Sequence, residues 1–427
     1  MVMISQGRTI VAIDVGTTKV FTVVGQVGAA GDVRVLAHST VPNDGLRKGN
    51  VEDVAATSQA IRESVADVER QTGQRIKSAY IGVTGAHVTF ENAHQTFEGI
   101  GSSGVVTAED LRRMSQRIAA ASASSAAEPG RKVIHAIPME YAVDGETGIR
   151  NPVGMHSRHL EVEAHLVTGG SYYIEKLVKA VEGAALRVDG LVLEPLASAL
   201  SVLTPEEREH GAVIVDIGGG TTDIVGFQHG HICYTGVIPV AGSQFTNDLV
   251  QAYHTTREAA EEIKVKYASA DPVSVDMKDV VVLPVPEKDV EQRIQRREVC
   301  QLVKERAQEL VYMIKSKVNE TQMEDSAIVL TGGGAKLPGL QHMVQRTFRG
   351  HVRTGAPNGH SHVPPELQNP AYATGVGIML WAAAEAPAAA ASRKSFGLES
   401  GLTGLIAMWS KQMKRWAPWA VLAPKHQ

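Results

Sequence analysis

The sequence predicts an α/β protein with two related lobes, and three observations carry this prediction. Short runs of β-branched residues alternate with segments of helical periodicity along most of the 427 residues. Aromatic residues make up only 5% of the chain while glycine occurs 41 times, which favours helices packed tightly on sheets over an all-β protein. A turn rich in glycine and threonine follows an apolar strand near residue 14 and again near residue 216, so one structural unit is used twice.

The expected elements follow from this alternation. Strands are expected at 10–13, 21–25, 79–83, 133–136, 160–167, 213–215, 224–227, 280–283 and 327–330. Helices are expected at 51–72, 108–123, 172–185, 196–203, 244–253, 256–267, 290–318, 339–347 and 372–384. Thr107 and Ser171 precede two of these helices and are expected to cap them, because a hydroxyl oxygen can accept from the free N–H groups of a first turn.

Composition excludes several classes of protein. The net charge of -4 argues against a general nucleic-acid surface, so no nucleic-acid partner is expected. Cys233 and Cys300 are too few for a disulfide framework, which favours a reducing compartment. No window approaches the ~20 unbroken apolar residues of a membrane span, and the N-terminal residues lack the apolar stretch of a secretory signal. We therefore expect a cytoplasmic chain whose contact with a membrane is peripheral.

Each of the two repeated turns has the chemistry of a phosphate-binding loop. Glycine lets backbone N–H groups approach a phosphate closely, and threonine hydroxyls add donors. Asp14 and Asp216 end the two strands and are the expected Mg²⁺ ligands, directly or through water, because Mg²⁺ prefers carboxylate and phosphate oxygens. The residues predicted to contact the nucleotide at these turns and at a third glycine turn are Asp14, Gly16, Thr17, Thr18, Lys19, Asp216, Gly218, Gly219, Gly220, Thr221, Thr222, Gly332, Gly333, Gly334 and Lys336.

The number and order of these turns make the signal specific. A single turn of this kind is more often an ordinary β-turn. Three of them, each after an apolar strand, predict a nucleotide whose polyphosphate and Mg²⁺ are clamped between two hairpins, with the third turn receiving the ribose and base.

The trio of turns resembles the actin, DnaK-chaperone and sugar-kinase superfamily. Residues 194–199 and 372–377 are similar to its two interdomain connecting helices. Residues 260–264 resemble the segment whose acid and lysine, here Glu261 and Lys264, reach the ribose and base; an ordinary solvated helix face is the alternative. By analogy with related chaperones, the resemblance implies that Glu194 positions water if ATP is hydrolysed, and ATPase activity is expected to be slow or negligible.

Three stretches resemble FtsA, the actin-like family of bacterial cell division. They are residues 133–144 continuing through 148–155, residues 191–203 followed by 206–209, and residues 237–242. The resemblance runs from about residue 9 to residue 384. It implies a two-lobed actin-like ATPase fold whose first lobe carries an FtsA-type insertion subdomain that contacts neighbouring molecules; a generic surface insertion is the alternative.

The resemblance implies a layout for the whole chain. The first-lobe core is expected at 8–83 and 166–203, the insertion at 84–165, and the second lobe at 204–369 with a smaller subdomain near 245–312. The second connecting helix is expected at 370–384, a linker at 385–399 and an amphipathic membrane-targeting helix at 400–419.

The expected C-terminal helix has one apolar face and a basic remainder. Such a helix suits insertion at a lipid headgroup boundary, and each basic residue adds ~1 kcal/mol near an anionic surface. A helix docked on the protein's own core is the alternative, although the preceding alanine- and proline-rich segment argues against it. The predicted membrane contacts are Leu402, Leu405, Ile406, Trp409, Met413, Lys414, Arg415 and Trp416.

The FtsA resemblance implies a filament-forming membrane tether at the division septum, on the cytoplasmic face of the membrane. It would anchor the tubulin-like protein FtsZ and recruit later division proteins. The FtsZ C-terminal peptide docks on the smaller subdomain in this family, and Arg296, Lys304 and Arg306 are the predicted contacts, with a solvated helix as the alternative. Two other functions remain open: a type IV pilus assembly protein of the same fold, and a sugar kinase or phosphatase.

Overall fold

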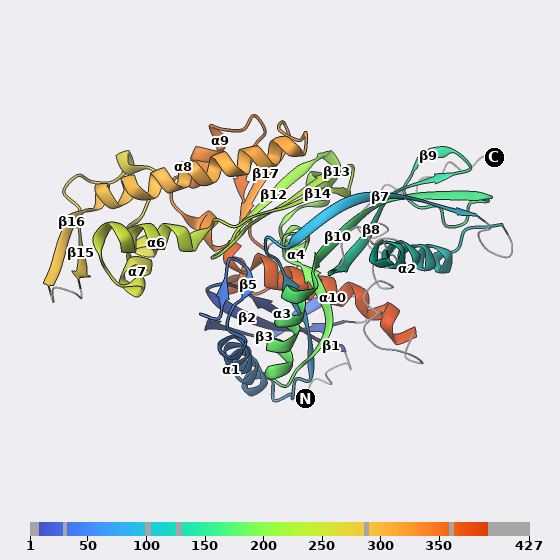
Figure 1. Cartoon of the computed structure of the whole chain (residues 1–427), viewed down its shortest axis with the longest axis horizontal. Coiled ribbons are helices and arrows are strands. Elements are labelled where there is room, and N and C mark those ends of the chain that lie inside the picture. Colours follow the sequence, from blue (N-terminus) through green and yellow to red (C-terminus); the bar gives the residue numbers. More distant parts are fainter. Residues whose placement is uncertain are drawn as a thin grey trace.

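A computed structural model describes residues 8–28, 32–98, 104–124, 130–285, 290–357 and 363–391. The predicted membrane helix at 400–419 lies outside the described residues. Figure 1 shows an elongated molecule with one sheet of each lobe near its middle, a small sheet with one helix at one end, and a long helix leading to a hairpin at the other.

The first lobe is a five-stranded sheet in the order β11-β6-β1-β2-β3. β1 pairs antiparallel with β2 and parallel with β6. The helix α1 (Val54–Thr72) begins at Asp53, whose carboxylate accepts from the Ala56 N–H, and ends at the left-handed Gly73. The strands are β1 (Arg8–Val15), β2 (Lys19–Val27), β3 (Val33–Pro42), β6 (Ser78–Val83) and β11 (Arg187–Leu193).

The second lobe repeats this sheet. Its order is β14-β13-β12-β17-β18, and β12 pairs antiparallel with β13 and parallel with β17, as β1 does with β2 and β6. The predicted repeat of one unit in two lobes is therefore confirmed at the level of strand pairing. The strands are β12 (Ala212–Ile217), β13 (Thr222–Gln228), β14 (His231–Ile238), β17 (Ala327–Thr331) and β18 (Val352–Thr354).

Two helices join the lobes and pack against each other. They are α4 (Glu194–Val202) and α10 (Ala373–Ala391). A Cβ at Gly377 would overlap the Ala197 backbone, so the two helices cross at very short range because this position has no side chain. α10 also includes residues 385–391, so the helix extends into the segment predicted to be a linker.

The insertion forms a separate four-stranded sheet in the order β7-β10-β8-β9. One helix, α2 (Ala108–Ser124), packs on this sheet through Leu111, Met114 and Ile118. The predicted cap at Thr107 is confirmed, because its hydroxyl accepts from the Asp110 N–H (3.2 Å) while Asp110 accepts from the Thr107 N–H (2.9 Å). The strands are β7 (Val88–Glu98), β8 (Arg131–Val143), β9 (Glu146–Ile149) and β10 (His159–Gly170).

In the smaller subdomain of the second lobe, one predicted helix is shorter than expected. The helix expected at 290–318 begins only at residue 296, because residues 290–295 form a strand paired with the preceding one. Pairing across this hairpin outweighs the helical periodicity of the segment. The subdomain consists of α6 (Gly242–Tyr253), α7 (Arg257–Tyr267), β15 (Val280–Val285), β16 (Val290–Gln295) and α8 (Arg296–Glu320).

Short elements complete the chain, and one predicted cap is wrong. Ser171 is the first residue of α3 (Ser171–Gly183), and Gly170 stands at the cap position without a side-chain bond. Within the described ranges, no helix has both the length and the apolar character needed to cross a bilayer. The remaining helices and strands are α5 (Pro205–His210), α9 (Leu340–Gln345), β4 (Leu46–Arg47) and β5 (Asn50–Val51).

Candidate nucleotide-binding site

A cleft of about 450 Å³ lies between the two lobes, and the predicted phosphate turns line it. The two hairpins have matching geometry. The Gly16 N–H donates to the Lys19 carbonyl (3.0 Å), and the Gly218 N–H donates to the Thr221 carbonyl (2.9 Å). Because the same short turn closes each hairpin, the backbone N–H groups inside both turns lie at corresponding places on the two sides of the cleft.

The hairpins also touch each other. A Cβ at Gly219 would lie 2.6 Å from the Thr18 Cγ2, and a Cβ at Gly220 would overlap the Thr17 hydroxyl. Glycine at these two positions therefore lets the threonines of the first hairpin approach the backbone of the second.

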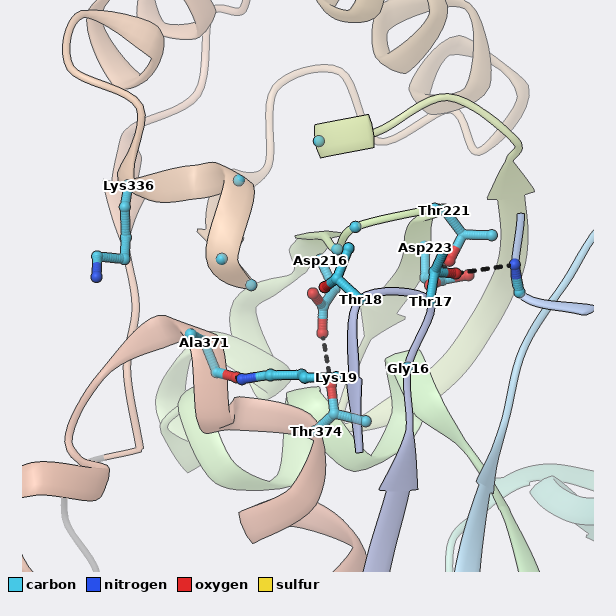
Figure 2. Close-up of a pocket in the computed structure, with 18 of the residues that line it drawn as sticks. Gly16, Thr17, Thr18, Lys19, Asp216, Thr221, Asp223, Lys336, Ala371 and Thr374 are labelled. Carbon is cyan, nitrogen blue, oxygen red and sulfur yellow. Dashed lines mark hydrogen bonds between the residues drawn. The ribbon is translucent and has the colours of Figure 1, made fainter. Parts of the chain in front are cut away.

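The third glycine turn follows β17 and packs against the end of the neighbouring strand β12. Gly332 has φ of 82°, and a Cβ there would overlap both the Asp216 carboxylate and the Ile217 carbonyl. Gly333 is the open position of this turn, since a Cβ there would meet only the Ala371 Cβ at 3.9 Å. Lys336 follows and also lines the cleft, apart from the two hairpins (Figure 2).

Four buried carboxyl groups face one another at the base of the cleft: Asp14, Glu194, Asp216 and Asp223. Burial raises the pKa of Asp14 to about 6, with Lys19 opposing and Asp216 adding to the shift. Burial likewise raises the pKa of Asp223 to about 7 and that of Glu194 well above its ordinary value. Gathering these groups away from water without a matching positive charge is unfavourable for their ionised forms.

Two side chains from the connecting helices hold Asp216. Its Oδ2 accepts from the Thr374 hydroxyl (3.0 Å) in α10 (Figure 2). It also accepts from the Ser198 hydroxyl in α4. Lys19 extends toward the residues that precede α10. Its Nζ donates to the Ala371 carbonyl (2.6 Å) and lies 4.3 Å from the centre of the Tyr372 ring. The end of β12 is thus joined to both helices that link the lobes, and the first hairpin is joined to the residues just before α10.

Comparison with known proteins identifies the family. The sequence profile described as cell division protein FtsA matches residues 213–377, and the one described as the SHS2 domain inserted in FtsA matches residues 85–168. The cell division protein FtsA of Pseudomonas aeruginosa is 35% identical over 388 residues, which cover 89% of this chain and 91% of that protein. The chain belongs to the FtsA family. The FtsA of Escherichia coli is 31% identical over 430 residues, covering 97% of this chain and 99% of that protein.

Solved structures support the same fold. A PilM-PilN type IV pilus biogenesis complex aligns with a TM-score of 0.62 at 17% identity, covering 87% of this chain and 97% of that one. MreB 5 of Spiroplasma citri, solved with AMPPNP, aligns with a TM-score of 0.51 at 14% identity, covering 88% and 96%. The two-lobed actin-like fold with an FtsA-type insertion is thus confirmed, and the FtsA family assigns the chain a role in cell division rather than in pilus assembly.

In this FtsA-family chain, the second hairpin differs from the prediction at two residues: Thr222 does not line the cleft, and Asp223 does. The side chain of Thr222 is fully buried, and its hydroxyl donates to the Val240 carbonyl (2.8 Å) instead of lining the cleft. Asp223, which was not among the predicted residues, lines the cleft together with Thr221. Strand alternation was the available signal, since it places residues 221 and 223 on one face and 222 on the other.

The other predicted contacts with the nucleotide lie along the cleft. Lys264 Nζ donates to the Glu261 carboxylate (2.7 Å), to the Thr246 hydroxyl (3.0 Å) and to the Gly242 carbonyl (3.1 Å). This network fixes Glu261 and Lys264 at the wall formed by α6 and α7. Sequence reasoning missed Thr84, Gly242 and Thr374, which also line the cleft, because they come from segments distant in the chain.

The carboxyl groups fit a hard divalent cation. Mg²⁺ is usually held by one or two carboxylates together with waters and phosphate oxygens, and Asp14 and Asp216 supply such a pair. The described residues contain no cluster of three or more side chains suited to hold a metal without such further ligands. Asp14 and Asp216 would hold such a cation, whose charge would offset the repulsion among the four acids.

The three predicted partner-binding residues lie on α8 but differ in their surroundings. Arg306 forms a two-pronged ion pair with Asp248 of α6 (2.6 and 2.9 Å). Arg296 donates to Asp279 (2.9 Å). Lys304 instead borders a groove between α8 and α9.

Proposed function

We propose that this FtsA-family protein is an ATP-binding, filament-forming membrane tether of the division ring, which holds FtsZ at the cytoplasmic face of the membrane. One observation carries the proposal: two matched hairpins face each other across a cleft that also contains the acid cluster and a third glycine turn. This arrangement suits a magnesium nucleoside triphosphate, whose charged end needs many N–H and hydroxyl donors and a cation.

Each wall of the cleft has a part in binding ATP. The hairpin N–H groups and the hydroxyls of Thr17 and Thr18 would hold the phosphates. Asp14 and Asp216 would hold Mg²⁺, which neutralises phosphate charge when bound. The third turn and the pair Glu261 and Lys264 lie where the ribose and base would extend. MreB 5 of Spiroplasma citri, a structural neighbour solved with AMPPNP, supports a nucleotide in a cleft of this fold.

Hydrolysis, where it occurs, would depend on Glu194. It is the first residue of α4, is buried and lines the cleft beside the acid cluster. Burial, with the neighbouring Asp14 and Asp223, raises the pKa of its carboxyl group well above the ordinary value, which disfavours the ionised form that a general base needs. We therefore expect slow turnover, suited to a scaffold that changes state with its nucleotide.

A groove of about 780 Å³ between α8 and α9 supports docking of the FtsZ C-terminal peptide. We call it the α8–α9 groove. The side chains that border it combine positive charge with exposed apolar surface: Val273, Lys304, Tyr312, Lys315, His342 and Arg346. Val273 and Tyr312 are each 75% exposed, and neither Lys304 nor Lys315 forms an ion pair within the described part of the chain. An extended peptide with acidic and apolar residues matches this surface.

Arg296 and Arg306 contribute less available positive charge to that surface than predicted. Their guanidinium groups are already paired with Asp279 and Asp248. Among the three residues predicted on α8, Lys304 is the one whose charge is available to a peptide.

Membrane attachment and filament formation rest on the sequence and the family. The basic amphipathic segment at 400–419 would lie in the lipid headgroup layer. The insertion and the smaller subdomain occupy opposite ends of the elongated molecule (Figure 1), an arrangement suited to head-to-tail assembly of identical subunits. Later division proteins would join this assembly.

Titration with a fluorescent ATP analogue, with and without Mg²⁺, tests the nucleotide site. We expect Mg²⁺ to strengthen binding, and Asp14→Asn to remove most of that gain. Asp44→Asn removes an equal charge at an exposed position of the same lobe and should leave it intact. Equal binding by wild type and Asp14→Asn with Mg²⁺ would contradict the proposed cation site, and no binding by wild type would contradict the function.

A further inference from the structure

The insertion grows out of the first lobe but is also fastened to the second. His165 in β10 lies 3.0 Å from the Thr235 hydroxyl in β14, and both side chains are buried. Phe90 in β7 packs edge-on against Tyr234, with ring centres 5.2 Å apart. The insertion therefore contacts β14 through two neighbouring residues of that strand.

A second attachment lies at the root of the insertion, inside the cleft. Thr84 joins β6 to β7, and its hydroxyl donates to the Asp223 Oδ1 at the start of β13. The other carboxylate oxygen of Asp223 accepts from the Thr221 hydroxyl (3.0 Å). Thr84, Thr221 and Asp223 are buried and line the nucleotide cleft, so any ligand at the second hairpin meets this short chain of hydrogen bonds.

Both attachments reach the same pair of strands. β13 and β14 are antiparallel neighbours, and Thr235 lies opposite Val225, two residues beyond Asp223. The insertion thus contacts the β13–β14 hairpin at two places. One is Asp223, at the end of the hairpin nearest the cleft, and the other is Thr235, farther along. If the lobes rotate about α4 and α10, the insertion cannot keep its position relative to both lobes, because it is bound to each.

We propose that the Thr84–Asp223 hydrogen bond couples occupancy of the cleft to the position of the insertion relative to the second lobe. This inference rests on the proposed nucleotide site. A polyphosphate at the second hairpin competes for the Thr221 hydroxyl and places negative charge beside Asp223, so the carboxylate shifts. Thr84 follows that shift and passes it to β7, which begins four residues later and carries Phe90. Thr84 is a positioning residue, since it acts through Asp223.

Pulsed electron paramagnetic resonance between spin-label pairs tests this coupling. One label on Val153 reports the insertion, and the second is placed on Ser316 in the second lobe or on Glu63 in the first, all of which are exposed. The native cysteines, Cys233 and Cys300, are first replaced by alanine. Distances are measured without nucleotide and with saturating ATP and Mg²⁺, and binding of a fluorescent ATP analogue is titrated on the same proteins.

Three variants assign the effect to the hydroxyl of Thr84. Thr84→Val removes it with little change in shape, and Thr84→Ser keeps it. Thr89→Val removes a hydroxyl that lies within the insertion sheet, 3.3 Å from that of Thr168. We expect ATP to shift the Val153–Ser316 distance in wild type, Thr84→Ser and Thr89→Val, and this shift to be lost in Thr84→Val.

Two results would overturn the inference while leaving the nucleotide site intact. One is a wild-type protein that binds ATP without any change in either distance. The other is an undiminished shift in Thr84→Val at saturating ATP. Failure of the wild type to bind ATP would instead overturn the proposed function, and the coupling with it.

Discussion

Gly220 of the second hairpin lies directly against Thr17 of the first, with no room for a Cβ between them. Residues from the two lobes therefore touch at the floor of the cleft, beside the proposed phosphate site. Because the contact requires glycine at position 220, replacing it with alanine, which adds one methyl group, is enough to test it.

Gly220→Ala should separate the two hairpins. The added methyl group overlaps the Thr17 hydroxyl, and overpacking of this kind typically costs ~1–3 kcal/mol. We expect a melting temperature several degrees lower and at least tenfold weaker ATP binding. Gly333→Ala is the control for stability, since its methyl group would meet only the Ala371 Cβ at 3.9 Å. Equal melting temperatures for Gly220→Ala and wild type would contradict the packing described.

Asp223 should make the stability of the nucleotide-free protein fall as pH rises. Its pKa is about 7 in the folded protein against an ordinary value of 3.8, so the folded state retains a proton that the unfolded state releases. The associated stability is complete below pH 3.8 and is lost as pH rises through about 7. Asp223→Asn removes this dependence and keeps an acceptor for Thr84.

The measurement is thermal unfolding of nucleotide-free wild type and Asp223→Asn between pH 5 and pH 8, where each pKa unit corresponds to ~1.4 kcal/mol. The variant should gain stability relative to wild type as pH increases. A constant difference between the two proteins across this range would show that Asp223 does not titrate there.

Glu194→Gln should separate hydrolysis from binding. The substitution preserves the shape of the side chain and removes its capacity to accept a proton from water. We expect single-turnover hydrolysis of bound ATP to slow ~100-fold, while the affinity for ATP changes by less than threefold. Hydrolysis at the wild-type rate in Glu194→Gln would exclude this residue from the reaction.

Reversing the charge of Lys304 and Lys315 together should weaken binding of the FtsZ C-terminal peptide. Both side chains border the α8–α9 groove, and we expect a loss of about tenfold, or ~1.4 kcal/mol. The control reverses Lys77 and Lys179, two exposed lysines of the first lobe. Fluorescence anisotropy of a labelled peptide measures both, and unchanged affinity in the groove variant would remove the groove from the account.

The sequence predicted the parts of the site that are local in the chain. Both phosphate hairpins and the third glycine turn have their chemistry within a few residues, and their repetition revealed the two lobes. It could not predict that Thr374 and Ser198 hold Asp216, because Thr374 lies 158 residues from that aspartate and the contact exists only after the lobes pack. Residues 290–295 were assigned to a helix for the same reason, since their strand depends on pairing with β15.

The insertion shows the same limit at a larger scale. Its existence was predicted from family-like segments, whereas its attachment to the second lobe through His165 and Thr235 was not. Neither residue belongs to a motif; both are polar and buried, and each supplies a hydrogen-bond partner for the other.

Co-pelleting with anionic liposomes, with and without ATP and Mg²⁺ and followed by electron microscopy, tests the tether most directly. The account predicts that the full chain sediments with the vesicles and forms filaments on them when ATP is present, and that removal of residues 400–427 abolishes sedimentation. Equal sedimentation of the full and truncated chains, or no sedimentation of either, would contradict a tether anchored by its C-terminal segment.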